Sequence, residues 1–214
     1  DGLAHFDGSA WTVYSTVNSG LPDRYVAYIF VDSQGTKWLA VGDGVSALRA
    51  DGTWRNYQFK AAATRGIAED TDGSIWFTDP LFGIAGHWEG APADSETPWA
   101  VYRIAPEGGA LQKMIDDMAA PNGLAFTPDE RGLHVVESRA EPHRRIWLYD
   151  HAADGRLSNK RLYVDAQGPG AYDGIAVDAL GNVWCGFGSD GSLAAKPEEL
   201  DGVRVFDPQG RPLA

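Results

Sequence analysis

The stretch DTDGSIW at residues 70–76 decides the fold, because its spacing recurs along the chain. The pattern Asp-x-x-Gly-x-x-Trp occurs three times, at residues 32–38, 70–76 and 178–184. A degenerate fourth copy at residues 129–135 has valine in the place of tryptophan. In each copy we expect the aspartate to bond to its own turn and the glycine to adopt a positive φ, with apolar strands on both sides. Each copy therefore predicts a β-hairpin.

The repeat has a second half, in which a strand is followed by another turn and a more polar strand. After the first copy, a strand-like run at residues 45–49 leads to a turn at residues 51–52 and to a more polar strand at residues 54–59. Each unit thus contains four antiparallel strands, and the units begin roughly 40 to 60 residues apart, as the blades of a β-propeller do. The tryptophans are expected to pack between blades. Frequent glycine and proline disfavour a helical bundle or a βαβ fold strongly, and a β-sandwich to a lesser degree.

The units account for four blades, at about residues 25–59, 64–118, 122–167 and 172 onward. Residues 1–15 are left over, and their pattern matches the outer two strands of a blade. We therefore expect an all-β fold, a single β-propeller domain over residues 1–214. It would have four to five blades of four antiparallel strands, with terminal strands that share a blade and close the ring. The alternative is self-association, in which an open blade edge pairs with another chain.

Composition excludes several classes of partner. The chain has 214 residues, 43% of them hydrophobic, and 30 acidic against 18 basic residues give a net charge of −12. The acidic surplus is scattered and no basic stripe is present, so neither nucleic acid nor a membrane is expected as a partner. No apolar window reaches about 20 residues and no apolar leader opens the chain, so we expect a soluble chain without a signal peptide, in an unknown compartment. Cys185 is the sole cysteine, which excludes an internal disulfide and a cysteine cluster for zinc.

Longer motifs resemble two known propeller families. From about residue 61 to 214 the chain is similar to the SMP-30/gluconolactonase family of six-bladed propellers, through DGSIWFTDP at residues 72–80, PNGLAFTPDE at residues 121–130 and YDGIAVD at residues 172–178. Residues 1–60 instead resemble the repeats of two-component-regulator propellers, the sensor domains of hybrid histidine kinases. This second resemblance rests on WTVY at residues 11–14, SGLPD at residues 19–23 and the first copy of the repeat at residues 32–38. Together they predict a chimera with a seam near residues 60–64.

The resemblance to the gluconolactonase family implies a site in the central channel. That family holds one divalent cation, with Ca²⁺ as the expected ion here, by side chains at the start of several innermost strands. Such a cation polarises a lactone carbonyl and activates a bound water. Alignment of the four blades on their turns makes Ala27, Arg65, Asn122 and Asp173 equivalent. Asn122 and Asp173 match the family's metal ligands, and Asp173 also matches its proposed catalytic base.

Two of the equivalent positions depart from the family pattern. Ala27 stands where the family has a glutamate ligand, and Arg65 stands where it has an asparagine. Because an arginine repels a cation, we expect Arg65 to bind substrate instead of metal. Glu137 and Asp79, at the ends of second strands, are candidates for further oxygen ligands.

Two functional classes are consistent with these residues. The first is a metal-dependent hydrolase of lactones or related esters, by ancestry, with a partly lost site and a small-molecule ligand in the channel. The second is a non-catalytic propeller, either a ligand-sensing or interaction module or a recombined or engineered scaffold. A Ser-His-Asp hydrolase is disfavoured, because no histidine stands beside a serine in a nucleophile-elbow pattern.

Overall fold

A computed structural model describes residues 2–42, 44–58, 64–82, 84, 94, 98–106, 108, 111–189 and 196–214. The seam expected near residues 60–64 lies outside these described residues, except for Thr64. Within the described ranges, none of the helical segments has the length and apolar character that a membrane span requires.

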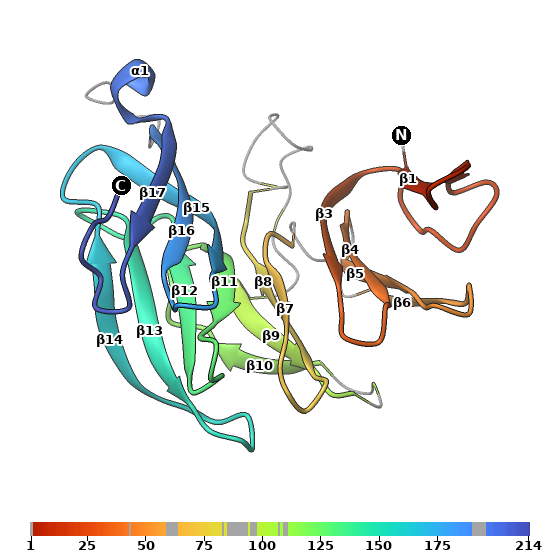
Figure 1. Cartoon of the computed structure of the whole chain (residues 1–214), viewed down its shortest axis with the longest axis horizontal. Coiled ribbons are helices and arrows are strands. Elements are labelled where there is room, and N and C mark those ends of the chain that lie inside the picture. Colours follow the sequence, from red (N-terminus) through yellow and green to blue (C-terminus); the bar gives the residue numbers. More distant parts are fainter. Residues whose placement is uncertain are drawn as a thin grey trace.

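The fold is all-β, with four antiparallel sheets that follow one another as the blades of a β-propeller (Figure 1). Blade 1 consists of β3 (Val26–Val31), β4 (Lys37–Val41), β5 (Gly44–Leu48) and β6 (Trp54–Gln58). Blade 2 consists of β7 (Ile67–Glu69), β8 (Ile75–Asp79), β9 (Ala100–Ile104) and β10 (Gln112–Ile115). Blade 3 consists of β11 (Pro121–Phe126), β12 (Gly132–Glu137), β13 (Arg145–His151) and β14 (Leu157–Asp165). Blade 4 consists of β15 (Gly170–Val177), β16 (Val183–Ser189) and β17 (Gly202–Phe206), with the short helix α1 (Pro197–Leu200) before β17.

Hydrophobic clusters fill each interface between neighbouring blades. Trp38 of blade 1 shares one cluster with Phe77 of blade 2, and Trp76 of blade 2 shares the next with Val135 of blade 3. Successive side chains of a strand point to opposite faces, so Trp76 and Phe77 pack against different neighbours. The prediction that Trp38 and Trp76 pack between blades is confirmed. Trp184 is 49% exposed, because it lies on the outer face of blade 4.

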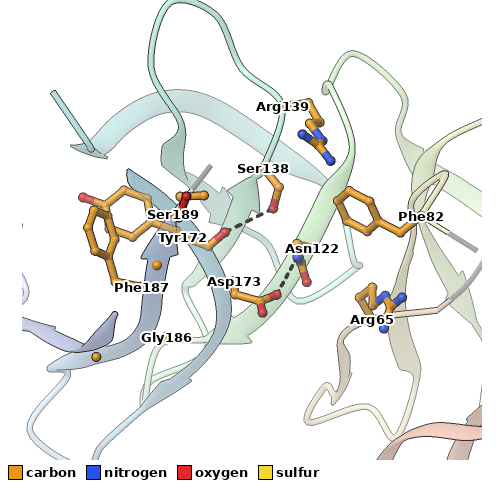
Figure 2. Close-up of a pocket in the computed structure, with 13 residues that line it drawn as sticks. Arg65, Phe82, Asn122, Ser138, Arg139, Tyr172, Asp173, Gly186, Phe187 and Ser189 are labelled. Carbon is orange, nitrogen blue, oxygen red and sulfur yellow. Dashed lines mark hydrogen bonds between the residues drawn. The ribbon is translucent and has the colours of Figure 1, made fainter. Parts of the chain in front are cut away.

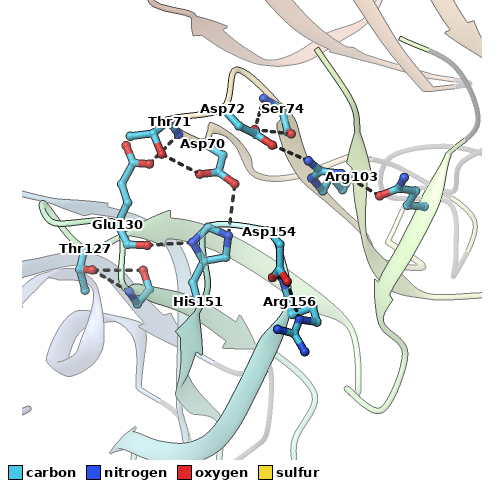
Figure 3. A network of polar contacts seen from close by, with 12 residues as sticks. Asp70, Thr71, Asp72, Ser74, Arg103, Thr127, Glu130, His151, Asp154 and Arg156 are labelled. Carbon is cyan, nitrogen blue, oxygen red and sulfur yellow. Dashed lines mark hydrogen bonds and ion pairs between the residues drawn. The ribbon is translucent and has the colours of Figure 1, made fainter. Parts of the chain in front are cut away.

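In two copies of the repeat, the aspartate of the turn binds both its own loop and the tryptophan of the same copy. Asp32 Oδ1 accepts a hydrogen bond from Thr36 N at 2.8 Å, and its Oδ2 accepts one from Trp38 Nε1 at 2.8 Å. Asp178 Oδ2 likewise accepts a hydrogen bond from Trp184 Nε1 at 3.1 Å. In these two copies, the spacing of aspartate and tryptophan therefore reflects a direct contact between their side chains. In the copy at residues 70–76, Trp76 Nε1 has no hydrogen-bond partner among the described residues, and Asp70 Oδ2 lies 3.2 Å from His151 Nε2 instead (Figure 3).

The turn of the degenerate copy begins two residues earlier than the sequence predicts. Glu130 N donates to Thr127 O at 2.8 Å, and Glu130 has a φ of 53°. Thr127 therefore takes the place of the aspartate, and Glu130 that of the glycine. The assignment of these places to Asp129 and Gly132 is wrong. Thr127 Oγ1 accepts a hydrogen bond from Gly132 N at 2.9 Å, as an aspartate would, and Gly132 already belongs to β12.

The terminal strands do not share a blade as expected. The strands β1 (Leu3–Phe6) and β2 (Trp11–Tyr14) form a sheet of their own, and Leu3 clusters with Leu39 on the outer face of blade 1. The edge of β17 is taken by the last residues of the chain, because Leu213 N donates to Val205 O at 2.7 Å and Val205 N donates to Ala214 O at 2.8 Å. The two ends consequently lie on opposite sides of the molecule (Figure 1).

Candidate functional site

A β-bulge interrupts the innermost strand at each expected ligand. Asn122 and Gly123 of β11 together face one residue of β12, and Asp173 and Gly174 of β15 together face one residue of β16. A bulge bends the strand and re-aims the side chains that it carries. The two bulges explain why Asn122 and Asp173 both reach the same cavity.

The other two blades have the same irregularity at the same place. In blade 2, Arg65 N donates to Thr78 O at 3.2 Å and Thr78 N donates to Gly66 O at 3.1 Å, so two residues again face one. In β3 the pairing with β4 shifts at Ala27. The equivalence of the four predicted positions is therefore a feature of the backbone as well as of the sequence.

Neighbouring bulges touch through their glycines. A Cβ atom on Gly66 would lie 3.0 Å from Asn122 O, and one on Gly123 would lie 2.6 Å from Asp173 O. Real Cβ atoms are not found at the shorter distance, so the backbones of β11 and β15 approach this closely only because residue 123 is glycine. The close approach brings the side chains of Asn122 and Asp173 together.

The contact between Asn122 and Asp173 is the centre of the site. Asn122 Nδ2 donates a hydrogen bond to Asp173 Oδ1 at 2.7 Å, as Figure 2 shows. Asn122 is only 7% exposed, whereas Asp173 is exposed. A buried amide thus orients a carboxylate that remains accessible from the cavity.

The thiol beside this carboxylate does not serve as a nucleophile. Cys185 of β16 is fully buried, and burial raises its pKa to about 12. The group stays a neutral thiol near pH 7, and the thiolate is the reactive form.

A cavity of about 610 Å³ contains the predicted site residues Arg65, Asn122 and Asp173 in its lining. Among the lining residues that escaped the sequence analysis are Phe82 and Arg139. Arg65 and Arg139 both lie over the ring of Phe82, with Cζ-to-centroid distances of 5.8 and 5.5 Å. Both missed residues follow the second strand of a blade, and an antiparallel hairpin places that end beside the start of the innermost strand. This pairing is the signal that could have revealed them.

The other predicted residues lie outside the cavity. Ala27 packs against the cluster between blades 1 and 2. Glu137 is buried, with Oε1 accepting from Ala119 N at 2.8 Å and Oε2 accepting from Trp147 Nε1 at 2.6 Å. Both carboxylate oxygens of Glu137 therefore accept hydrogen bonds within blade 3 and its preceding segment. Asp79 is 1% exposed and does not line the cavity.

The described side chains do not form a calcium cage by themselves. Asn122 and Asp173 offer one amide oxygen and one carboxylate, whereas Ca²⁺ takes about six to eight oxygen ligands. Among the described residues, no group of three or more His, Cys, Asp and Glu side chains could hold a metal ion. Arg65 lines the same cavity and adds a positive charge.

Known proteins resemble this chain in both sequence and structure. A gluconolactonase from Zymomonas mobilis is 29% identical over 194 residues, which cover 86% of this chain and 50% of that protein. The solved structure of XC5397 from Xanthomonas campestris, described as a gluconolactonase, has a TM-score of 0.71 and 32% identity, covering 88% of this chain and 60% of that one. The chain therefore spans about half the length of the curated gluconolactonase that it matches.

The sensor propellers share only the fold with this chain. The extracellular domain of a hybrid two-component system, BT4673 from B. thetaiotaomicron, has a TM-score of 0.62 at 12% identity, and the match covers 93% of this chain and 23% of that one. The chimera thus stays a prediction. The model of the SMP-30/Gluconolactonase/LRE-like region matches residues 21–214, which include most of the segment expected to differ. On this match, the chain belongs to the SMP-30/gluconolactonase/LRE-like family.

Proposed function

We propose that the cavity around Asp173 hydrolyses lactones, with Asp173 as the general base and Asn122 as its positioning residue. The observation that carries the proposal is the hydrogen bond of 2.7 Å between Asn122 Nδ2 and Asp173 Oδ1. Membership of the family supports lactone hydrolysis as the ancestral activity. An accessible carboxylate held in one orientation is what a general base requires.

In the proposed reaction, a water molecule beside Asp173 attacks the carbonyl carbon of the lactone. Asp173 takes one proton from that water, and negative charge develops on the carbonyl oxygen. When the tetrahedral intermediate collapses, the bond between the carbonyl carbon and the ring oxygen breaks. The ring oxygen then takes the proton from Asp173, which gives a hydroxy carboxylic acid and restores the base.

Arg65 has a supporting role in this proposal. Its side chain lines the same cavity, so the guanidinium adds positive charge to the cavity in which the carbonyl oxygen becomes negative. A divalent cation such as Ca²⁺ would supply the same stabilisation, but the two oxygen donors of Asn122 and Asp173 are too few to form its site. No step of the proposed reaction is therefore routed through a cation.

The test is a comparison of lactone hydrolysis by three variants with that of the parent chain. Asp173→Asn should lower kcat by about 100-fold or more, because the general base is lost. Asn122→Ala should lower kcat by about tenfold, because the carboxylate keeps its chemistry but loses its orientation. Asp116→Asn is the matched control, since Asp116 is an exposed carboxylate outside the cavity, and it should leave kcat unchanged. Equal rates for Asp173→Asn and the parent would contradict the proposal.

The second candidate is a non-catalytic propeller that binds a small molecule in the same cavity. Arg65 favours it, because an arginine occupies a position equivalent to those of Asn122 and Asp173 and reduces the affinity for a cation. Binding of a lactone without turnover by the parent chain would establish this candidate.

A further inference from the structure

We propose that one wall of the cavity, formed by Phe82, Arg65 and Arg139 and called the Phe82 wall here, binds a carboxylate or phosphate group of the substrate. The lactone that is turned over would then carry such an anionic group. The link to turnover rests on the proposed function, whereas the binding of an anion does not.

The described residues that line the cavity have a net charge opposite in sign to that of the chain. The whole chain has a net charge of −12. The described residues that line the cavity include two cations, Arg65 and Arg139, and one anion, Asp173. A cavity that concentrates positive charge within an acidic protein attracts anions selectively, because the surrounding surface repels them.

The geometry of the Phe82 wall suits an anion. Figure 2 shows Phe82 between Arg139 and Arg65, and their Cζ atoms lie 5.5 and 5.8 Å from its ring centroid. Contact with an aromatic ring orients a guanidinium group and its N–H edge. That edge matches the oxygens of a carboxylate or phosphate.

Arg139 is the residue on which the proposal depends most. Its backbone is fixed, because Arg139 N donates to Ala119 O at 3.0 Å, while its side chain is exposed at the cavity. In the described part of the chain, no carboxylate forms an ion pair with Arg139, and its ring contact is with Phe82. The charge of Arg139 is therefore not neutralised by any described side chain.

The opposite charges in the cavity determine the orientation in which an anionic substrate binds. The carboxylate of Asp173 repels an anionic group, and the two guanidinium groups attract it. In Figure 2 the Phe82 wall lies on the other side of Asn122 from Asp173. A lactone bound by its anionic group at this wall would present its neutral carbonyl toward Asp173.

The first test measures anion binding without any reaction. Calorimetry at low ionic strength would use inorganic phosphate and acetate as separate probes, and the tighter binder identifies the anionic group. Arg139→Gln should weaken binding by about tenfold, since a charge-assisted contact is lost. Arg156→Gln is the matched control, because Arg156 is an exposed arginine outside the cavity, and it should change nothing. The proposal is overturned if neither probe binds the parent, or if Arg139→Gln binds as tightly as the parent.

The second test compares a neutral sugar lactone with the same lactone carrying the preferred anionic group. Arg139→Gln should raise KM for the anionic lactone by about tenfold and leave its kcat and both constants of the neutral lactone unchanged. If anions bind through Arg139 but neither lactone is hydrolysed, the anion site stands and the proposed function fails. If both lactones are hydrolysed with equal KM and Arg139→Gln changes neither value, the anion site is overturned and the proposed function stands.

Discussion

At the scale of single residues, a buried histidine makes the stability of this propeller depend on pH. His134 of β12 is 2% exposed, and burial, together with the positive charge of Arg161, lowers its pKa to about 4. In the unfolded chain a histidine titrates near pH 6.5. As the pH falls below 6.5, the unfolded chain takes up the proton first, so stability is lost between about pH 6.5 and 4. The loss attributable to this side chain should reach about 3 kcal/mol at pH 4.

Urea denaturation at pH 7, 5.5 and 4 measures this effect. His134→Leu keeps an apolar side chain at the position and removes the titrating group, so its free energy of unfolding should fall less steeply with pH than that of the parent. The comparison uses the slope of the free energy of unfolding against pH. A difference in stability between the two proteins at pH 7 therefore does not affect it. Identical slopes in the two proteins would show that His134 is not responsible.

The sequence predicted Asn122 and Asp173 but not the residues beside them. Asp173 could be found because it lies five residues before Asp178, the aspartate of a repeated turn. Asn122 could be found from the family motif Pro-Asn-Gly, and its spacing matches only when it is counted to Thr127, which takes the aspartate's place in the structure. Phe82 and Arg139 follow strand ends, where no recurrent letter identifies them, and their role depends on a contact across two blades. Glu137 was a candidate ligand on its residue type and its place at the end of a second strand, and its hydrogen bonds within blade 3 were not visible in the sequence.

At the scale of strands, the site depends on how closely β11 and β15 approach each other. Gly123→Ala places a Cβ atom 2.6 Å from Asp173 O, which the backbones cannot accommodate without moving apart. We expect a loss of about 2 kcal/mol in stability and a weaker contact between Asn122 and Asp173. Gly174→Ala is the matched control, because a Cβ atom there meets nothing within 4 Å.

Thermal and urea denaturation of both glycine variants test this prediction. The Gly174→Ala variant should stay within about 0.5 kcal/mol of the parent. The account of the strand contact is wrong if the two variants are equally stable, or if Gly174→Ala is the more damaging change.

The sequence predicted the turns correctly in three copies of the repeat and misplaced the turn of the fourth copy. Three copies have an aspartate and a glycine that match the expected roles, and Gly35, Gly73 and Gly181 all have positive φ. In the fourth, a threonine hydroxyl replaces the carboxylate and Glu130 takes the left-handed conformation. The spacing of residues in the sequence cannot distinguish these two forms of the turn. The side-chain oxygen of either threonine or aspartate can accept the hydrogen bond of the backbone N–H group that closes the turn.

At the scale of the whole molecule, the repeat predicted the architecture but not the arrangement of the ends. Periodic hairpins specify blades, whereas the partner of a terminal strand depends on which apolar face is left open. Leu3 fills the outer face of blade 1, and the last residues of the chain cover the edge of β17. Val203 and Trp184 remain 61% and 49% exposed on blade 4. Self-association through this blade stays a prediction.

The central claim is that Asp173 activates water for attack on a lactone carbonyl, and oxygen-18 labelling tests it most directly. The parent chain and Asp173→Asn would each react with a sugar lactone in ¹⁸O-enriched water, with the buffer reaction subtracted. We predict one labelled oxygen in the product carboxylate with the parent, and a rate lower by about 100-fold with Asp173→Asn. An unlabelled ring-opened product, or equal labelling rates for the two proteins, would contradict the claim.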